Sequence, residues 1–91
     1  MIEITNNLLA EIENYAALMF TKKEIAVILE LDEVQFCDLL GKDKPQKAFQ
    51  RGRLKKEAEI RKSIFDLAQN GSSPAQSFAI KLIENAKMDD L

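Results

Sequence analysis

Apolar side chains recur every three or four residues along most of the chain, and this spacing is typical of amphipathic helices. No run alternates β-branched and polar residues in the way that predicts a strand. We therefore predict an all-α protein. The first helix should be capped by Thr5 or Asn6 and run to about Met19, with the polar side chains between its apolar positions turned outward. Its apolar face consists of Leu8, Leu9, Ile12, Ala16 and Met19.

Residues 22–41 carry two successive helix starts of the same design. Thr21 with Glu24, and Asp32 with Gln35, each have the spacing of a capping box, in which the cap side chain and the residue three positions later bond each other's backbone amides. A hydrophobic staple can accompany each start, formed by the pairs Phe20–Ile25 and Leu31–Phe36. Only residues 30–31 remain between the first helix and the second cap. The connection predicts two short helices that cross sharply.

This segment resembles the helix-turn-helix of DNA-binding proteins. The residues that carry the resemblance are Ile25, Ala26, Leu29, Leu31, Phe36 and Leu39. The resemblance implies that a preceding helix completes a trihelical unit and that the second helix of the motif enters the major groove. Glu30 stands at a turn position where the family usually has glycine, because the backbone there is often left-handed. A helical pair used only for packing is the alternative.

A second, longer helix pair should follow a turn and linker at residues 41–45. Pro45 suits the first turn of a new helix and should keep Lys44 out of helical geometry. From residue 47 a long helix should continue to Gly71, a good residue for ending it, although Gly52 weakens its first half.

The last helix should begin at Ser73 as cap, with Pro74 at its first position and Gln76 closing a capping box. Because the connection is short, we expect this helix to fold back antiparallel on residues 60–68. Its predicted buried stripe is Phe78, Ala79, Leu82, Ile83 and Ala86. We thus expect a single domain over residues 1–91, with a trihelical part at 1–41 and a helical hairpin within 45–88 that serves as an oligomerisation surface.

Charge is distributed very unevenly along the 91 residues, although the net charge is only −2. Residues 1–41 contain eight acidic and two basic side chains, whereas residues 42–62 contain nine basic and three acidic ones. A local basic block can bind a polyanion even on an acidic protein, because salt screens distant charges. The alternative is a solvated helix surface whose Arg and Lys stems cover apolar neighbours.

Residue types and motifs that many enzymes and metal sites use are missing from the sequence. It has no histidine, a single cysteine (Cys37) and no glycine-rich phosphate loop, so we expect no enzyme, no metal site and no cofactor. Cys37 fits a reduced residue of an intracellular protein. The apolar runs are short and no signal pattern opens the chain, so we expect a cytoplasmic protein, in a bacterial host cell, without a membrane partner.

The layout as a whole resembles the small terminase subunits of tailed phages and prophages, which join an N-terminal helix-turn-helix to a hairpin that assembles subunits. The carrying segments are residues 49–53 (FQRGR), 59–61 (EIR) and 67–71 (LAQNG), followed by Pro74, Ala75 and Phe78. The resemblance implies a homo-oligomeric DNA-packaging factor that presents double-stranded DNA to a large terminase subunit.

We predict phosphate contacts from basic residues at one helix start, in the linker and on the long helix, and we take Gln35 as the best candidate for contacting a base. The predicted DNA-binding residues are Lys22, Lys23, Gln35, Lys42, Lys44, Lys47, Arg51, Arg53, Lys55 and Lys56. A small helix-turn-helix transcriptional regulator and a protein-interaction module without DNA binding are the alternatives.

Overall fold

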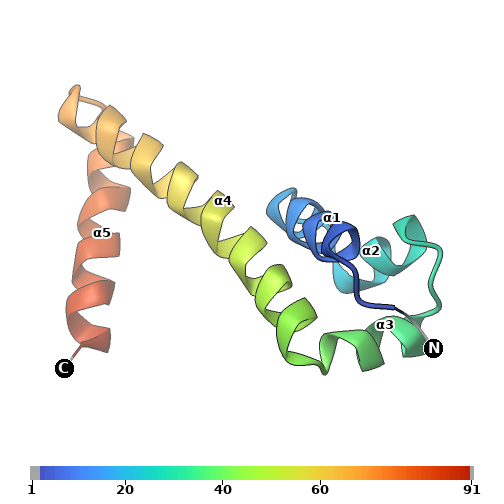
Figure 1. Cartoon of the computed structure of the whole chain (residues 1–91). Coiled ribbons are helices and arrows are strands. Elements are labelled where there is room, and N and C mark those ends of the chain that lie inside the picture. The colour runs from blue at the N-terminus through green and yellow to red at the C-terminus, as the bar shows by residue number, and fades with distance from the viewer. Residues whose placement is uncertain (1–2, 91) are drawn as a thin grey trace. The chain divides into compact units, whose positions relative to one another are not determined.

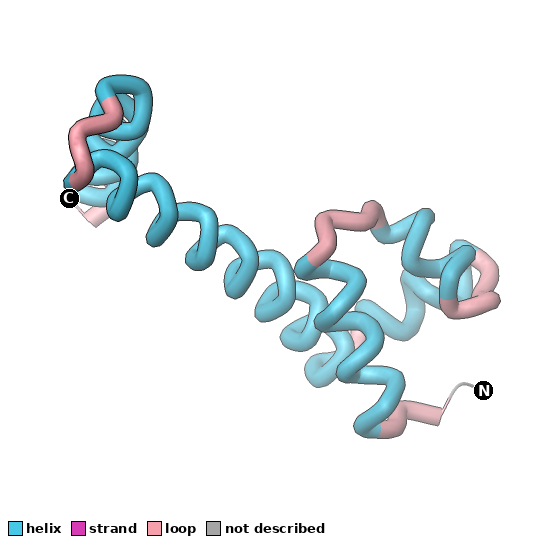
Figure 2. Tube along the Cα trace, turned by 90° about the horizontal axis from the view of Figure 1, so that it is seen from above, coloured by secondary structure: helices cyan, strands magenta, loops and turns pink. Residues whose placement is uncertain are grey.

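The computed structural model describes residues 3–90 and contains only helices within that range, which confirms the all-α class (Figures 1 and 2). In chain order the helices are α1 (Asn6–Ala17), α2 (Lys22–Ile28), α3 (Glu33–Leu40), α4 (Asp43–Gln69) and α5 (Ser73–Asp89). The chain divides into two compact units, and the boundary lies inside α4, between Lys56 and Glu57. We call them the N-terminal unit, residues 3–56, and the C-terminal pair, residues 57–90.

The predicted N-terminal caps of the first three helices are confirmed. The Thr5 hydroxyl accepts from the Leu8 amide at 3.1 Å. Both capping boxes are complete, with the Thr21 amide 2.9 Å from Glu24 Oε1 and the Asp32 amide 3.1 Å from Gln35 Oε1. Local sequence therefore determines where α1, α2 and α3 begin.

The ends of α1 and α2 are less ordinary, because each passes through a left-handed residue that is not glycine. Helix α1 ends at Ala17, close to the predicted end at about Met19, and Met19 itself has φ 66°. Glu30, after α2, has φ 59°. In both turns the next amide, of Phe20 or of Leu31, bonds back to a carbonyl five residues earlier, which is the Schellman pattern that closes a helix end.

Helix α4 begins at Asp43, inside the segment 41–45 that was predicted to be a turn and linker. Lys44 is helical and Pro45 is the third helical residue, so the expectation that Pro45 would exclude Lys44 from the helix is wrong. Proline lacks only an amide hydrogen that the first turn of a helix does not use, and its ring is buried in the N-terminal unit. The helix continues unbroken through Gly52 to Gln69.

The core of the N-terminal unit draws on all four of its helices. Ile12 and Ala16 from α1, and the α2 and α3 residues that carry the helix-turn-helix resemblance, meet the first turns of α4. The buried apolar side chains are Ile12, Ala16, Ile25, Ala26, Phe36, Leu39, Ala48 and Phe49. Residues of α4 thus contribute to the same core as residues of α1, α2 and α3.

The C-terminal pair closes differently from the expectation. Gly71 takes the left-handed conformation at φ 98°, as predicted for a glycine that ends α4. The cap of α5 is Ser72 rather than Ser73, with its hydroxyl 3.4 Å from the Ala75 amide. Gln76 does not close a capping box, because its side chain instead donates to the Ala68 carbonyl at 3.1 Å. The cap shifts by one residue because Ser72 follows Gly71 directly, where the chain turns.

The predicted buried stripe of α5 is largely uncovered. Of its five members only Ala79 is buried and Leu82 half-buried, whereas Phe78 and Ile83 are 60% and 44% exposed. Two helices can bury only the seam between them, so the remaining apolar side chains of this pair face outward.

Candidate nucleic-acid interface

All ten predicted DNA-binding residues lie in the N-terminal unit, and most of the basic ones already contact another group of the protein. Nine of them fall into three groups, placed respectively at the start and along the first half of α4, around the Phe49 ring, and on the α2–α3 side. The three groups differ in how accessible their side chains are to a phosphate.

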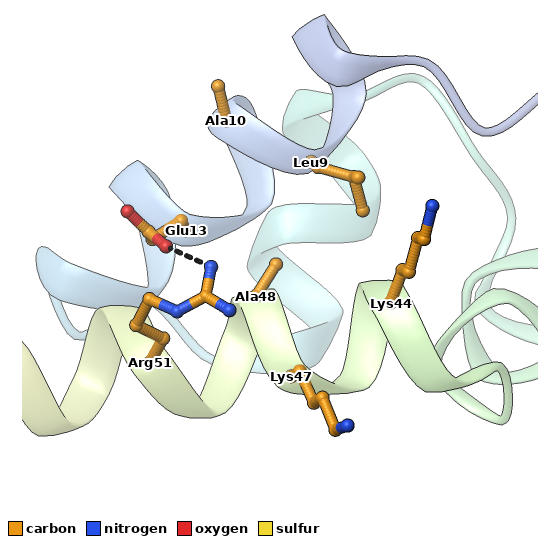
Figure 3. Close-up of a pocket in the computed structure, with 7 residues that line it drawn as sticks. All are labelled: Leu9, Ala10, Glu13, Lys44, Lys47, Ala48 and Arg51. Atoms are coloured by element: carbon orange, nitrogen blue, oxygen red, sulfur yellow. Dashed lines mark hydrogen bonds and ion pairs between the residues drawn. The ribbon is translucent and has the colours of Figure 1, made fainter.

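The first group surrounds Glu13, which projects from α1 toward α4 (Figure 3). One carboxylate oxygen of Glu13 lies 3.1 Å from Arg51 Nη1 and the other lies 3.3 Å from Lys55 Nζ. The hydrogen bond from Arg51, reinforced by Lys55, lowers the pKa of Glu13 below its usual value despite partial burial. The side chains of Arg51 and Lys55 remain 56% and 62% exposed, so other faces of these cations are open to solvent.

Gly52 brings the two helices together at this point. A Cβ on Gly52 would lie 2.1 Å from the Glu13 carbonyl oxygen and 3.1 Å from the Ala16 Cβ. Only glycine permits that approach, since real Cβ atoms do not come so close to a backbone oxygen. The glycine that looked like a weakness in α4 is therefore the contact that seats α4 on α1.

A groove of about 400 Å³ lies beside this contact and is open to solvent. Figure 3 shows Arg51 directed toward Glu13, while Lys47 points away from α1. Lys47 lies 3.4 Å from the Asp43 carboxylate, an exposed pair one helical turn apart that contributes little to stability. The lining residues are Leu9, Ala10, Glu13, Lys44, Lys47, Ala48 and Arg51. Lys42 and Lys44 also line a neighbouring hollow at the start of α4.

The second group has a structural role in the fold. Arg53 donates from Nη2 to the Phe20 carbonyl at 3.1 Å, and its guanidinium carbon lies 4.6 Å from the centroid of the Phe49 ring. Its Nε is buried and has no hydrogen-bond partner among the described residues. Lys22 lies over the same ring at 5.5 Å. These are cation–π contacts, and they tie Arg53 to the packing of the unit more than to solvent.

The third group includes the face of α3 that the resemblance aims at the major groove. Gln35 Oε1 accepts from the Asp32 amide, so bidentate pairing of Gln35 with adenine would require opening the cap of α3. Lys23 lies 3.8 Å from Glu33. Glu33, Val34, Cys37 and Asp38 are all exposed on this helix.

The sequence did not predict that Glu13 pairs with Arg51 and Lys55, nor that cations pack on the Phe49 ring. Glu13 was assigned to the solvent face of α1, whereas it is only 24% exposed and faces α4. A glycine inside a helical pattern was the available signal, because it often marks a close backbone approach. Lys56, also predicted as a contact, is half-buried.

Comparison with known protein families, with characterised proteins and with solved structures finds no match to this chain. Among the residues that the structure describes, no group of three His, Cys, Asp or Glu side chains could hold a metal ion. No helix between residues 3 and 90 is long and apolar enough to cross a membrane.

Proposed function

We propose that the protein is a non-enzymatic DNA-binding protein that holds the phosphate backbone of double-stranded DNA along α4. The observation that supports this most directly is a stripe of cations, Lys44, Lys47, Arg51 and Lys55, which we call the α4 basic stripe. Its members follow one another at intervals of three, four and four residues, so they share one side of the helix. They are all exposed, and the helix that carries them is seated firmly on α1.

Readout of bases by α3 contributes little in this proposal. Asp32, Glu33 and Asp38 would meet phosphates with like charge, and Gln35 is engaged in its cap. Binding through phosphates is independent of sequence, because these contacts carry no base information. A DNA-packaging factor of the terminase small-subunit type fits this behaviour better than a transcriptional regulator, which must prefer one operator. The helix-turn-helix arrangement of α2 and α3 belongs to the same proposal.

Self-association through the C-terminal pair is the second part of the proposal. The pair exposes Ile60, Leu67, Phe78, Ile80, Ile83 and Met88, each at least 44% exposed. Apolar side chains gathered on so small a unit favour contact with another protein surface. A homo-oligomer would also present several α4 basic stripes to one duplex, which raises avidity.

The test is a titration of a labelled random-sequence duplex at several salt concentrations, followed by fluorescence anisotropy. We expect log affinity to fall linearly with log salt concentration, by about 0.9 for each phosphate contact. Replacing Lys44, Lys47 and Lys55 by Gln should weaken binding at least about tenfold at low salt and reduce the slope by up to about three.

The matched control removes the same charge from the other unit, through Lys62→Gln, Lys81→Gln and Lys87→Gln. It should leave the affinity near that of the wild type. Equal losses in the two triple variants, or no binding by the wild type at low salt, would refute the assignment of the α4 basic stripe.

A protein-interaction module remains the second candidate, and one surface favours it. Val27 on α2 and Val34 on α3 are 76% and 70% exposed, and α3 also exposes the acidic side chains Glu33 and Asp38. Exposed apolar side chains on a helix that also carries acidic ones suit a basic amphipathic partner. Absence of DNA binding together with a weakened partner complex in Val27→Ser would favour this candidate.

A further inference from the structure

Glu13 is the acidic side chain that the fold places against the α4 basic stripe. It accepts from Arg51 through one oxygen and from Lys55 through the other, at 3.1 and 3.3 Å. The two cations are each more than half exposed, whereas Glu13 is 24% exposed. An anion therefore already contacts two of the four cations to which the proposed function assigns phosphates.

The backbone contact at Gly52 keeps this carboxylate in place. Gly52 lies one residue after Arg51 and three before Lys55, and its Cα faces the Glu13 carbonyl. The distance between the carboxylate and the two cations is therefore set by helix packing and not only by flexible side chains. Glu13 is ionised at neutral pH, and its bonds to Arg51 and Lys55 lower its pKa further below the usual value.

We propose that Arg51 and Lys55 form an exchangeable anion site, occupied by the Glu13 carboxylate in the free protein and by a phosphodiester of duplex DNA in the complex. This inference rests on the proposed function and adds the residue that limits its affinity. Like a carboxylate, a phosphodiester has two charged oxygen acceptors that guanidinium and ammonium groups can bind.

The exposure of Arg51 and Lys55 favours exchange of the Glu13 carboxylate for a phosphate, whereas the negative charge of Glu13 opposes it. The open sides of Arg51 and Lys55 allow a phosphate to approach without unfolding α1, and arginine has further N–H donors beyond the one bonded to Glu13. The displaced carboxylate stays close to the incoming phosphate, because the contact at Gly52 keeps the Glu13 backbone against α4. Glu13 thus holds the affinity for DNA below the value that the same cations would give alone.

The experiment compares Glu13→Gln with Glu11→Gln in the duplex titration. Glu11 is exposed on the same helix, so its substitution removes an equal charge from α1 without touching the site. We expect Glu13→Gln to bind about 3- to 10-fold more tightly at low salt, with a salt slope steeper by one to two as both cations become available to phosphates. Glu11→Gln should change the affinity less than twofold.

A double-mutant cycle distinguishes competition from a purely structural role. In a chain that also carries Arg51→Gln and Lys55→Gln, the gain from Glu13→Gln should disappear, because no cation is left to release. Thermal unfolding of each variant shows that the titrations are made on folded protein. A structural role alone would lower the melting temperature without tightening binding.

The two proposals fail in different ways. Wild-type binding that is insensitive to Lys44→Gln, Lys47→Gln and Lys55→Gln, or no binding at all, overturns the proposed function and this inference with it. Wild-type binding that depends on those lysines, but is equal in Glu13→Gln and Glu11→Gln or weaker in Glu13→Gln, overturns only the inference.

Discussion

The N-terminal unit and the C-terminal pair differ in how their apolar side chains are covered. Four helices in the N-terminal unit enclose eight apolar residues, including Phe36, Ile12 and Ile25, which are almost completely inaccessible. The C-terminal pair buries only Ala75 and Ala79, although it carries more than six large apolar side chains. Similar helical patterns thus give a core only where a third and a fourth helix close over the first two.

Turn chemistry follows the same division. The C-terminal pair turns at Gly71, which has φ 98° and no steric cost, whereas the N-terminal unit turns at Met19 and Glu30, where the left-handed backbone is unfavourable. Packing around the N-terminal turns holds these residues in place, because Phe20 and Leu31, which follow them, contact the core. Tertiary contacts maintain the first unit, and local preference maintains the second.

Among the substitutions that test this difference between the two units, we expect the largest change in stability at Gly52. Alanine normally stabilises the interior of a helix by up to about 1 kcal/mol relative to glycine. Gly52→Ala should instead destabilise the N-terminal unit by about 2 to 3 kcal/mol, since its Cβ would lie 2.1 Å from the Glu13 carbonyl oxygen. Urea unfolding followed by the fluorescence of Tyr15, the only tyrosine, reports on this unit.

Gln50→Ala is the control for that change, because it alters an exposed position two residues earlier in the same helix. It should shift the unfolding free energy by less than about 0.5 kcal/mol. If Gly52→Ala were as stable as the wild type, α1 and α4 would not be in direct backbone contact.

The sequence predicted the parts of this fold that depend on neighbours in the chain. The caps at Thr21 and Asp32, the end of α4 near Gly71 and the inward set Phe36 and Leu39 follow from spacing alone. What could not be predicted depends on partners far away in sequence. Glu13 faces Arg51 across 38 positions. A periodic pattern shows which face of a helix is apolar, but not which other element covers that face. The apolar stripe of α5 was therefore predicted to be buried, whereas most of it is exposed.

The candidate site could likewise be predicted only where it depends on neighbours in the chain. Charge counts located the basic block and its place on a long helix. They could not separate Arg53, which packs on Phe49 and bonds the Phe20 carbonyl, from the exposed Lys44 and Lys47. Only the contacts divide the basic residues into those that hold the fold and those that can meet a phosphate.

Hydrogen exchange of backbone amides would measure the difference in stability between the two units. Amides of α5 should exchange at least about tenfold faster than those around Ile25 and Phe36, because little buried surface opposes opening of the C-terminal pair. Mass-spectrometric or NMR exchange at two protein concentrations measures both units in one sample. Protection of α5 that rises with concentration would show that a second copy covers its apolar face. Equal protection in both units at low concentration would contradict the contrast drawn above.

The smallest expected effect concerns the turn residues, and it tests whether packing or local preference maintains each turn. Glu30→Gly should stabilise the N-terminal unit by about 0.5 to 1 kcal/mol, because glycine relieves the left-handed backbone at φ 59°. Gly71→Ala should destabilise the C-terminal pair by about 1 kcal/mol for the opposite reason. Space is not a factor there, since an added Cβ would meet nothing within 4 Å. Tyr15 fluorescence for Glu30→Gly and exchange of the α5 amides for Gly71→Ala would measure the two changes separately. A loss of stability in Glu30→Gly would mean that the Glu30 side chain contributes more to the turn than its backbone strain costs, and the contrast between the two kinds of turn would then no longer hold.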